Sequence, residues 1–525
     1  MNSSLCHCIT LVQRRYTSES TTFASSIYLH TLHCLLLIHC ATLPLFHSAT
    51  LPLLASSISR TMPTPQPIAT PAVPATSDWS PTSWRSKQVF GLPAYDAGAP
   101  VDDAFKALAA LPPLVTSWEI ERLRGWLAEA EQGKRFILQG GDCAERLDDC
   151  RSDAIANKLK ILLQMSIILV HAAKKPVVRV ARLAGQYAKP RSTLTETRNG
   201  ITLPSYFGDL INHADFNKDA RTPDPWLLVR GYTYAALTLN FIRSLSEGGF
   251  ADLHHPEYWD LAFFKHASLS EQRRTDYLSL VRNLADGLRF MEALGERSIA
   301  DATRVDFFTS HEGLSLWYES AQTRRVPRRD GWYDLTTHLP WIGERSRNLS
   351  GAHVEFFRGI RNPVGVKVGP KVTPDEVLEL AKILNPANER GKLVLIARMG
   401  ADKVATTLPP LLEATKRANV HAAWICDPMH GNGTITPDGV KTRTFDAIRR
   451  ELEGACSAHA QIGVPLAGVH FELTGEDVTE CVGGASGVTE ADLATNYVSL
   501  CDPRLNYAQS MEMAFLLGAA LTARD

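Results

Sequence analysis

The sequence lacks an excess of charge of either sign. Its 55 Lys and Arg residues against 56 Asp and Glu residues leave a formal net charge of −1. A general nucleic-acid-binding protein needs a cationic excess to displace the counterions of phosphates, so the composition argues against that class. Hydrophobic residues are 45% and charged residues 21%, which is a globular composition and excludes a disordered or fibrous chain.

Closely spaced cysteines are also missing after residue 40. Four of the ten cysteines lie within the first 40 residues, and the other six are far apart, with no CxxC pair. Such spacing does not build a disulfide framework, which favours a reducing compartment. Any cysteine with a special role is therefore expected to be a metal ligand or a reactive thiol.

Several signature motifs are absent. Walker A, GxGxxG and HExxH patterns do not occur, which argues against a P-loop NTPase, a Rossmann enzyme or a zincin. A convincing membrane span is missing too, because the most apolar stretch, Leu29–Phe46, is short and interrupted by His30, His33, His39 and Pro44. We expect neither a nucleic acid nor a membrane as partner.

Residues 1–61 do not resemble the rest of the chain. They hold one acidic residue and many Ser and Thr, as organelle transit peptides do. The equal alternative is upstream sequence before a true start at Met62. The first interpretation predicts a plastid protein and the second a cytoplasmic one. Residues 62–81, rich in Pro and Thr, are expected to form an extended tether before a catalytic domain over 82–525.

Short apolar runs alternate with helical patterns after residue 82. Helices are expected over Asp103–Leu111 and over Thr116–Gln132, the second with Ser117 as N-cap and Glu121 near its first turn. Alternating strands and helices predict a parallel sheet, and eight candidate strands suggest a closed (β/α)8 TIM barrel of the α/β class; a doubly wound open sheet is the alternative. A gap of over 120 residues after the second strand predicts a long helical insertion at about 190–300, beside the N-terminal extension. The eight runs are Phe136–Gln139, Val177–Ala181, Val305–Thr309, Val354–Phe357, Val364–Val368, Leu393–Ala397, Ala422–Cys426 and Gly468–Leu473.

Four potential metal ligands follow the ends of different strands. A barrel places its active site at the carboxyl ends of its strands, so these side chains are expected to meet. One S, one N and two O donors suit a divalent Mn, Co, Fe or Zn ion. Each residue alone is more simply a buried Cys, a satisfied His or a paired acid, but together they favour a metal site. They are Cys143, His430, Glu472 and Asp502.

Cations gather at the same predicted pole. Arg398 closes an apolar strand and Lys367 lies inside VGVKV, so both are expected to be buried. Several converging cations favour a phosphate, while the structural alternative pairs them with Glu344, Asp427 or Glu476. Arg182 and Arg345 complete the set.

Seven motifs in sequence order resemble the plant-type, or class II, 3-deoxy-D-arabino-heptulosonate 7-phosphate (DAHP) synthases. The resemblance runs from about Trp84 to the C-terminus. It implies a transferase that condenses phosphoenolpyruvate with erythrose 4-phosphate and water to DAHP and phosphate, the first step of the shikimate pathway to chorismate and the aromatic amino acids. The motifs are GGDCAE (140–145), RLAGQYAKPRS (182–192), WIGERSR (341–347), NPVGVKVGP (362–370), DPMHGN (427–432), ELTGEDVTECVGG (472–484) and CDPRLN (501–506).

The resemblance also assigns residues. It implies a divalent metal on the four ligands named above, with Mn2+ expected first and Co2+ or another ion as alternatives. It implies a homo-oligomer, and Lys367 and Glu344 as catalytic residues. The phosphoenolpyruvate pocket would comprise Arg182, Glu344, Arg345, Lys367 and Arg398, with Trp341 in its wall, and erythrose 4-phosphate would contact Lys189, Arg191 and Ser192.

Two other functions stay open at this point. One is a different metal-dependent sugar-phosphate aldolase or phosphatase on the same barrel, and the other is a non-enzymatic scaffold. The segments 431–439 and 145–150 depart from the family pattern and leave loop details open. Cys501 directly precedes Asp502, so a disulfide with Cys143 in the absence of metal is expected about as much as a simple buried thiol.

Overall fold

A computed structural model describes residues 79–191, 193–247 and 306–522, together with helical residues 271, 272, 275, 279 and 282. The predicted leader, most of the predicted tether and Ser192 lie outside the described residues. So does the part of the predicted insertion from 248 to 300, apart from those five positions.

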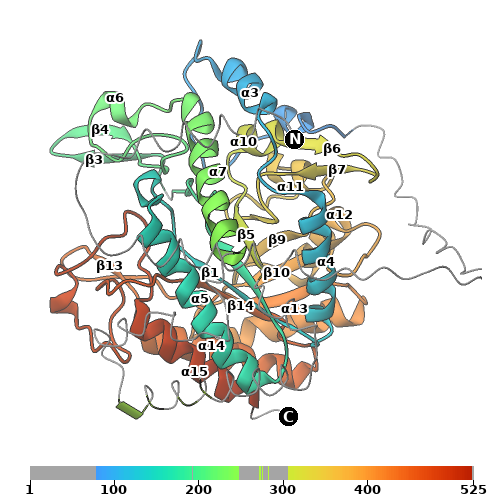
Figure 1. Cartoon of the computed structure of the whole chain (residues 1–525), viewed down its shortest axis with the longest axis vertical. Helices are drawn as coiled ribbons and strands as arrows, with labels where there is room; N and C mark the ends of the chain where they lie inside the picture. The colour runs from blue at the N-terminus through green and yellow to red at the C-terminus, as the bar shows by residue number, and fades with distance from the viewer. Residues whose placement is uncertain are drawn as a thin grey trace, which may run out of the picture. The chain divides into compact units, whose positions relative to one another are not determined.

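Eight parallel strands close into a barrel (Figure 1). Each barrel strand pairs with the barrel strand that follows it in the sequence, and β1 also pairs with the last one, β14, which closes the ring. The predicted TIM barrel is confirmed, and the open sheet is excluded. The strands are β1 (Phe136–Gly141), β2 (Val177–Arg182), β5 (Phe307–Glu312), β8 (Leu339–Ile342), β9 (Val364–Val368), β10 (Leu393–Ala397), β11 (Ala423–Cys426) and β14 (Gly468–Glu472).

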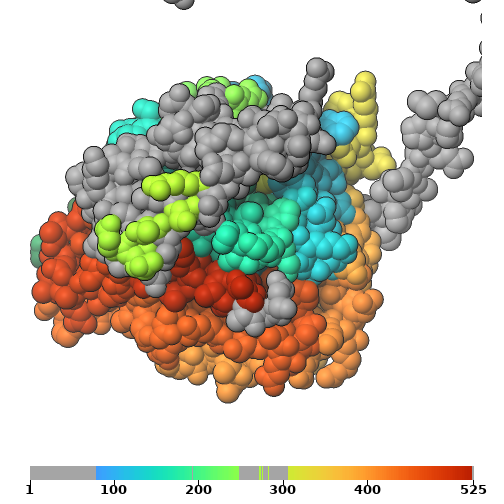
Figure 2. All heavy atoms as spheres, turned by 60° about the horizontal axis from the view of Figure 1, so that its bottom comes forward, coloured from blue at the N-terminus to red at the C-terminus, as the bar shows by residue number. Residues whose placement is uncertain are grey.

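Helices surround this barrel. Figure 2 shows the turquoise α5 beside the red α15 on one face, with orange residues of the last third of the chain below them. Although α5 is long and apolar enough to cross a membrane, most of its side chains are buried in the protein. The helices are α3 (Val101–Ala110), α4 (Ser117–Glu131), α5 (Ser152–Ala173), α6 (Lys218–Arg221), α7 (Trp226–Glu247), α10 (Leu316–Ala321), α11 (Ala352–Phe357), α12 (Pro374–Leu384), α13 (Val404–Arg417), α14 (Phe445–Ile462) and α15 (Tyr507–Thr522), with 3-10 turns η1 (Ser83–Ser86), η2 (Leu147–Asp149) and η5 (Glu490–Asp492).

One predicted strand is wrong, and one strand was missed. Val354–Phe357 lies in α11, where every residue except Glu355 is buried. The prediction failed because a run of four residues is too short for its periodicity to separate a helix from a strand. The strand in its place is β8, whose sequence LPWI contains Pro340. Proline cannot donate a hydrogen bond to a neighbouring strand, so a four-residue segment that contains it is hard to recognise as a strand from the sequence.

Two smaller predictions also need correction. The N-cap of α4 is Thr116 rather than Ser117, and it forms a capping box with Glu119. The described part of the insertion is not wholly helical, because it begins with a hairpin of β3 (Thr195–Arg198) and β4 (Ile201–Pro204) before α6 and α7. Further hairpins are formed by β6 (Thr323–Arg325) with β7 (Trp332–Asp334), and by β12 (Thr434–Ile435) with β13 (Lys441–Thr442).

The end of the predicted tether packs against the folded chain. The indole Nε1 of Trp79 donates to the carbonyl oxygen of Glu355 at 2.9 Å, and its ring meets that of Trp332 edge-on at 6.2 Å. A few residues on, Trp84 is buried and packs edge-on against Trp317. The folded unit therefore includes residues from Trp79 onward.

The interior of the barrel is apolar toward the amino ends of the strands. Alternate strand residues point to the same side, so one residue in two faces inward. On several strands the inward-facing residue nearest the carboxyl end is polar instead of apolar. These polar side chains form the candidate site. The buried apolar cluster includes Ile137, Val178, Val180, Phe308, Leu339, Trp341, Val394, Ile396, Ala423, Ile425 and Ala467.

Candidate active site

The period of two along each strand positions most of the polar side chains. Arg182 follows Val180 by two residues on β2, and Asp427 follows Ile425 at the end of β11. The same spacing places other groups at this end of the barrel. They are Glu312 after Ser310, Arg398 after Ile396, and Glu472 after His470.

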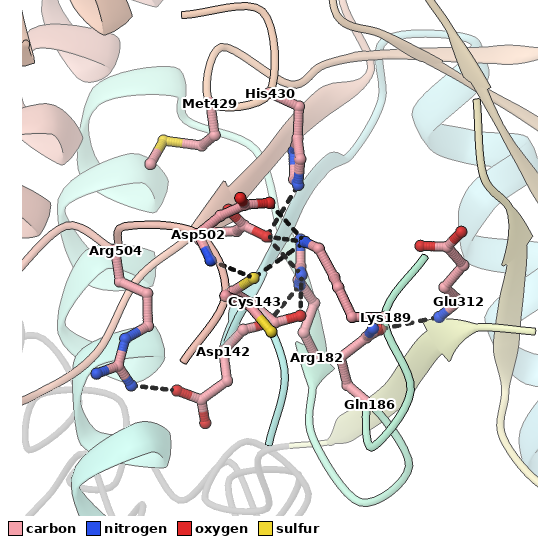
Figure 3. Close-up of polar contacts among 12 residues, drawn as sticks. Asp142, Cys143, Arg182, Gln186, Lys189, Glu312, Met429, His430, Asp502 and Arg504 are labelled. Carbon is pink, nitrogen blue, oxygen red and sulfur yellow. Dashed lines mark hydrogen bonds and ion pairs between the residues drawn. The ribbon is translucent and has the colours of Figure 1, made fainter. Parts of the chain in front are cut away.

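The four predicted metal ligands come together (Figure 3). One donor atom from each of Cys143, Glu472 and Asp502 lies within 4.8 Å of the others. His430 joins them, because its Nε2 lies 2.9 Å from Oε1 of Glu472. The donors come from the end of β1, the loop after β11, the end of β14 and the segment before α15.

Asp427 orients the imidazole of His430. Its Oδ2 lies 2.8 Å from His430 Nδ1, which leaves Nε2 directed at the other donors. Burial opposes ionisation of Asp427, but His430 and the contacting ammonium of Lys367 outweigh it and hold the pKa of this carboxyl well below its ordinary value. A carboxylate behind a ligating histidine is the usual supporting arrangement of metal sites.

Glu472 is buried among cations. Burial alone would raise its pKa, yet His430, Lys189, Arg443 and Arg182 together hold it well below the ordinary value. Arg443 lies 2.8 Å from Oε2, and Arg182 lies 3.0 Å from Oε1. Glu472 is therefore ionised and fixed in place.

Cys143 is a buried thiol. Burial, a hydrogen bond with the Cys501 thiol and the nearby charge of Glu472 raise its pKa well above the ordinary value. The backbone N–H of Asp502 donates to its Sγ at 3.2 Å. Binding of a divalent ion here would release the thiol proton.

Lys189 lies inside this donor set. Its Nζ is 2.9 Å from Cys143 Sγ, 2.9 Å from Asp502 Oδ2 and 3.2 Å from Glu472 Oε1. The three potential ligand atoms already surround the positively charged Lys189 ammonium, so their chemistry and placement fit a bound cation. Of the other residues expected at erythrose 4-phosphate, Arg191 is half-buried and Ser192 lies outside the described residues.

A hydrogen-bond chain across the barrel fixes Arg182. Its guanidinium donates to His470 Nε2 at 2.7 Å, so the His470 proton is on Nδ1, which donates to Gln139 Oε1 at 2.8 Å. Burial and the charges of Lys367 and Arg182 lower the pKa of His470 well below its ordinary value, which keeps the ring neutral. Sequence reasoning missed His470, although its position two residues before Glu472 is a signal for it.

Trp341 lies close to two of the predicted phosphoenolpyruvate cations. The Arg182 guanidinium is 5.3 Å and the Lys367 ammonium 5.8 Å from the centre of its indole ring. Burial lowers the pKa of Lys367 to about 8, although contact with Asp427 opposes that shift. Lys367 can therefore change its protonation state near neutral pH.

The remaining predicted pocket residues lie at the rim. Arg398 donates to the backbone carbonyl oxygen of His430, and its own Nε is buried without a hydrogen-bond partner. Glu344 pairs with Arg347 at 3.1 Å and lies against Gly369, just beyond the end of β9. Arg345 is exposed, and its charge acts on Glu312.

Two further charged residues were not assigned from the sequence. Arg443, in the link between β13 and α14, contacts Glu472, and no strand or motif pointed to it. Glu312 ends β5, and its Oε1 is buried without a hydrogen-bond partner. Burial raises the pKa of Glu312 against the opposing charges of Lys189 and Lys367. The period of two from Ser310 could have identified this residue.

Known proteins resemble this chain over the same region. Residues 79–518 match the class-II DAHP synthetase family. Three relatives are named phospho-2-dehydro-3-deoxyheptonate aldolase. The relative from Neurospora crassa is 45% identical over 85% of this chain and 94% of its own length. Those from Streptomyces coelicolor and Mycolicibacterium smegmatis are 46% and 44% identical, over 84% and 80% of this chain and 97% and 90% of their own lengths.

The family match spans the barrel and every residue of the candidate site. This chain therefore belongs to the class-II DAHP synthetase family.

Proposed function

We propose that this protein is a DAHP synthase, the transferase that opens the shikimate pathway toward chorismate and the aromatic amino acids. It condenses phosphoenolpyruvate with erythrose 4-phosphate and water, and releases DAHP and inorganic phosphate. Family membership and the names of the relatives support this activity. The observation that carries it is the meeting of a four-residue donor set with buried cations at the carboxyl end of one barrel.

The cations suit a small, doubly anionic substrate. Arg182 and Lys367 lie 5.3 and 5.8 Å from the centre of the Trp341 ring, and Arg398 has a buried N–H with no hydrogen-bond partner among the described residues. Charge-assisted hydrogen bonds to carboxylate and phosphate are the strong ones, and prepositioned cations bring the reacting carbons together. We assign phosphoenolpyruvate to these three residues, with Glu344 and Arg345 at the rim.

The donor set supports a divalent ion. Cys143, His430, Glu472 and Asp502 would hold it, and when bound it would supply Lewis acidity at the aldehyde oxygen of erythrose 4-phosphate. A mixed S, N and O set is compatible with Mn2+, our first expectation, and with Co2+. Asp427 keeps the His430 imidazole in the required orientation.

Two residues are assigned to proton transfer. Lys367, with a pKa of about 8, holds a proton that it can donate or take back during the reaction. Glu344, near the end of β9, is assigned to orient the water that adds to C2 of phosphoenolpyruvate. We also expect the working enzyme to be a homo-oligomer, which sedimentation of the purified chain would test.

One assay tests the activity. Phosphate release from phosphoenolpyruvate should require both erythrose 4-phosphate and a divalent ion, and His430→Ala should abolish it. A circular dichroism spectrum like that of wild type would show that this variant still folds. Undiminished turnover after removal of metal with a chelator, or phosphate release without the aldehyde, would contradict the assignment.

A further inference from the structure

The Lys189 ammonium contacts three of the four proposed metal ligands (Figure 3). The side chain is only 9% exposed, and its Nζ lies 2.9 to 3.2 Å from Cys143, Glu472 and Asp502. One sulfur and two carboxylates contact this single nitrogen, so an ammonium lies where the donors converge.

An ion and this ammonium cannot share the donors. Metal–ligand bonds to these atom types are about 2.0–2.3 Å long, so an ion bound to the same three atoms would lie against the nitrogen. Two cations in contact repel strongly in a site from which water is excluded. One of them must leave when the other binds.

Lys189 is the cation that is free to leave. Arg182 also donates to the backbone carbonyl oxygens of Asp142 and Cys143, and Arg443 donates to that of Pro503. Among the described contacts, the Lys189 ammonium touches only the three metal ligands. The two arginines have anchors outside the donor set, and the lysine has none.

A second acceptor is close to the same loop. The backbone N–H of Glu312 donates to Gln186 Oε1 at 2.9 Å, and Gln186 lies three residues before Lys189. Among the described residues Oε1 of Glu312 is buried without a hydrogen-bond partner, and the charges of Lys189 and Lys367 act on this carboxyl. A displaced ammonium would find this carboxylate, or the phosphate of a bound substrate, on the pocket side.

We propose that Lys189 and the divalent ion exchange in one donor set, so that ion binding moves the ammonium from Cys143, Glu472 and Asp502 toward Glu312 and the substrate pocket. Lys189 thus neutralises the two carboxylates before the ion binds and becomes available to substrate only afterwards. The proposal rests on the metal site of the proposed function.

Mn2+ affinity tests the exchange directly. Free Mn2+ is measured by electron paramagnetic resonance during titration of the full chain at fixed pH and salt. Wild type must break three charge-assisted contacts to bind the ion, whereas Lys189→Met need not. The variant should therefore bind Mn2+ about tenfold or more tightly than wild type.

Lys441→Met is the matched control. Lys441 also reaches a ligand, 3.5 Å from Asp502 Oδ1, but its side chain is 48% exposed and this is its one ion pair with the described residues. An exposed pair contributes little, so the affinity should stay within about threefold of wild type. If Lys189→Met does not fold, Lys189→Gln should show the same tightening.

Thermal unfolding gives a second measurement. Without metal, Lys189→Met should melt below wild type, because the carboxylates of buried Glu472 and partly buried Asp502 lose a counter-ion. Mn2+ should raise the melting temperature of this variant more than that of wild type. Unchanged or weaker Mn2+ binding by a folded Lys189 variant would overturn the exchange. Equal Mn2+ binding by wild type and His430→Ala would instead overturn the metal site, and the exchange with it.

Discussion

At the scale of single residues, charge neighbours decide which groups can act at neutral pH. The buried acids Glu472 and Asp427 stay ionised because cations surround them, whereas the Cys143 thiol stays protonated because burial and a nearby carboxylate act together. The protonation of Lys367 is less firmly fixed than that of these three groups. Burial lowers its pKa to about 8, so a modest change in pH alters its charge.

Lys367 should give the reaction an alkaline limit. Its ammonium is the form that can bind phosphate and donate a proton, and this form is lost as pH rises through about 8. We therefore expect kcat/KM for phosphoenolpyruvate to fall above that pH, since this ratio reports groups of the free enzyme. Lys367→Arg keeps its positive charge to high pH, so the fall of kcat/KM above about pH 8 (the alkaline limb) should disappear. Lys367→Met should lower kcat more than it raises KM if the lysine transfers a proton.

The control for this prediction is Lys441→Met, which removes an exposed ammonium near the same site. It should leave the alkaline limb in place. An identical limb in Lys367→Arg would show that another group titrates there.

Cys501 should make the enzyme sensitive to oxidation. The Cys143 and Cys501 thiols are hydrogen-bonded to each other, and both are buried. A disulfide between them would consume a proposed metal ligand, so mild oxidant applied to the metal-free protein should prevent later addition of Mn2+ from restoring activity. Mn2+ present during the treatment should protect the protein, and a reductant should reverse the loss. Cys501→Ser should stay active and lose this sensitivity. Inactivation of Cys501→Ser as fast as wild type would exclude the bridge.

At the scale of elements, the register of the strands accounts for much of what the sequence could predict. Strand β10 is a continuous apolar run followed by Arg398, and β9 is apolar apart from Lys367, which is how strands buried on both faces look in a sequence. The same periodicity could have identified His470 and Glu312. It could not identify Arg443, because the position of that side chain depends on the fold of a loop after the hairpin β12–β13.

Short elements were the least predictable. Strand β8 has only four residues and helix α11 only six, and most of their side chains are buried. Tertiary packing rather than local preference decides their conformation. The predicted number of eight strands is correct, but one member of the set is wrong, because Val354–Phe357 was predicted as a strand and β8 was not.

The capping box of α4 should contribute measurably to stability. Thr116 accepts a hydrogen bond from the backbone N–H of Glu119, and the Glu119 carboxylate accepts one from the backbone N–H of Thr116 at 2.7 Å. Replacement of such a cap by Ala costs about 1 kcal/mol. Thr116→Ala should lower the free energy of unfolding by roughly that amount in urea, with no change in kcat.

Thr116→Ser provides the comparison, because it keeps the accepting hydroxyl and should be close to wild type. A Thr116→Ala variant as stable as wild type would mean that the cap is replaced by water.

At the scale of the whole molecule, motifs and periodicity predicted the barrel and the polar side chains that meet at its carboxyl end, but not the packing of Trp79 at the end of the predicted tether. Proline-rich composition assigned residues 62–81 to a tether as a block. Trp79 nevertheless packs on Trp332 and donates to the Glu355 carbonyl oxygen. A single aromatic residue at the edge of a low-complexity segment gives no sequence signal of the surface that it will cover.

This boundary yields a prediction for truncated chains. A variant that begins at Asp78 keeps Trp79 and Trp84, so it should retain the kcat and melting temperature of the full chain. One that begins at Lys87 loses both indoles and the turn η1. Loss of a buried Trp side chain typically costs about 3–5 kcal/mol, so this variant should melt well below the first. Differential scanning calorimetry and the phosphate-release assay would compare the two. A fall in kcat on removal of residues 1–77 alone would show that the segment belongs to the working enzyme, and equal melting temperatures of the two variants would show that the packing of Trp79 and Trp84 does not stabilise the barrel.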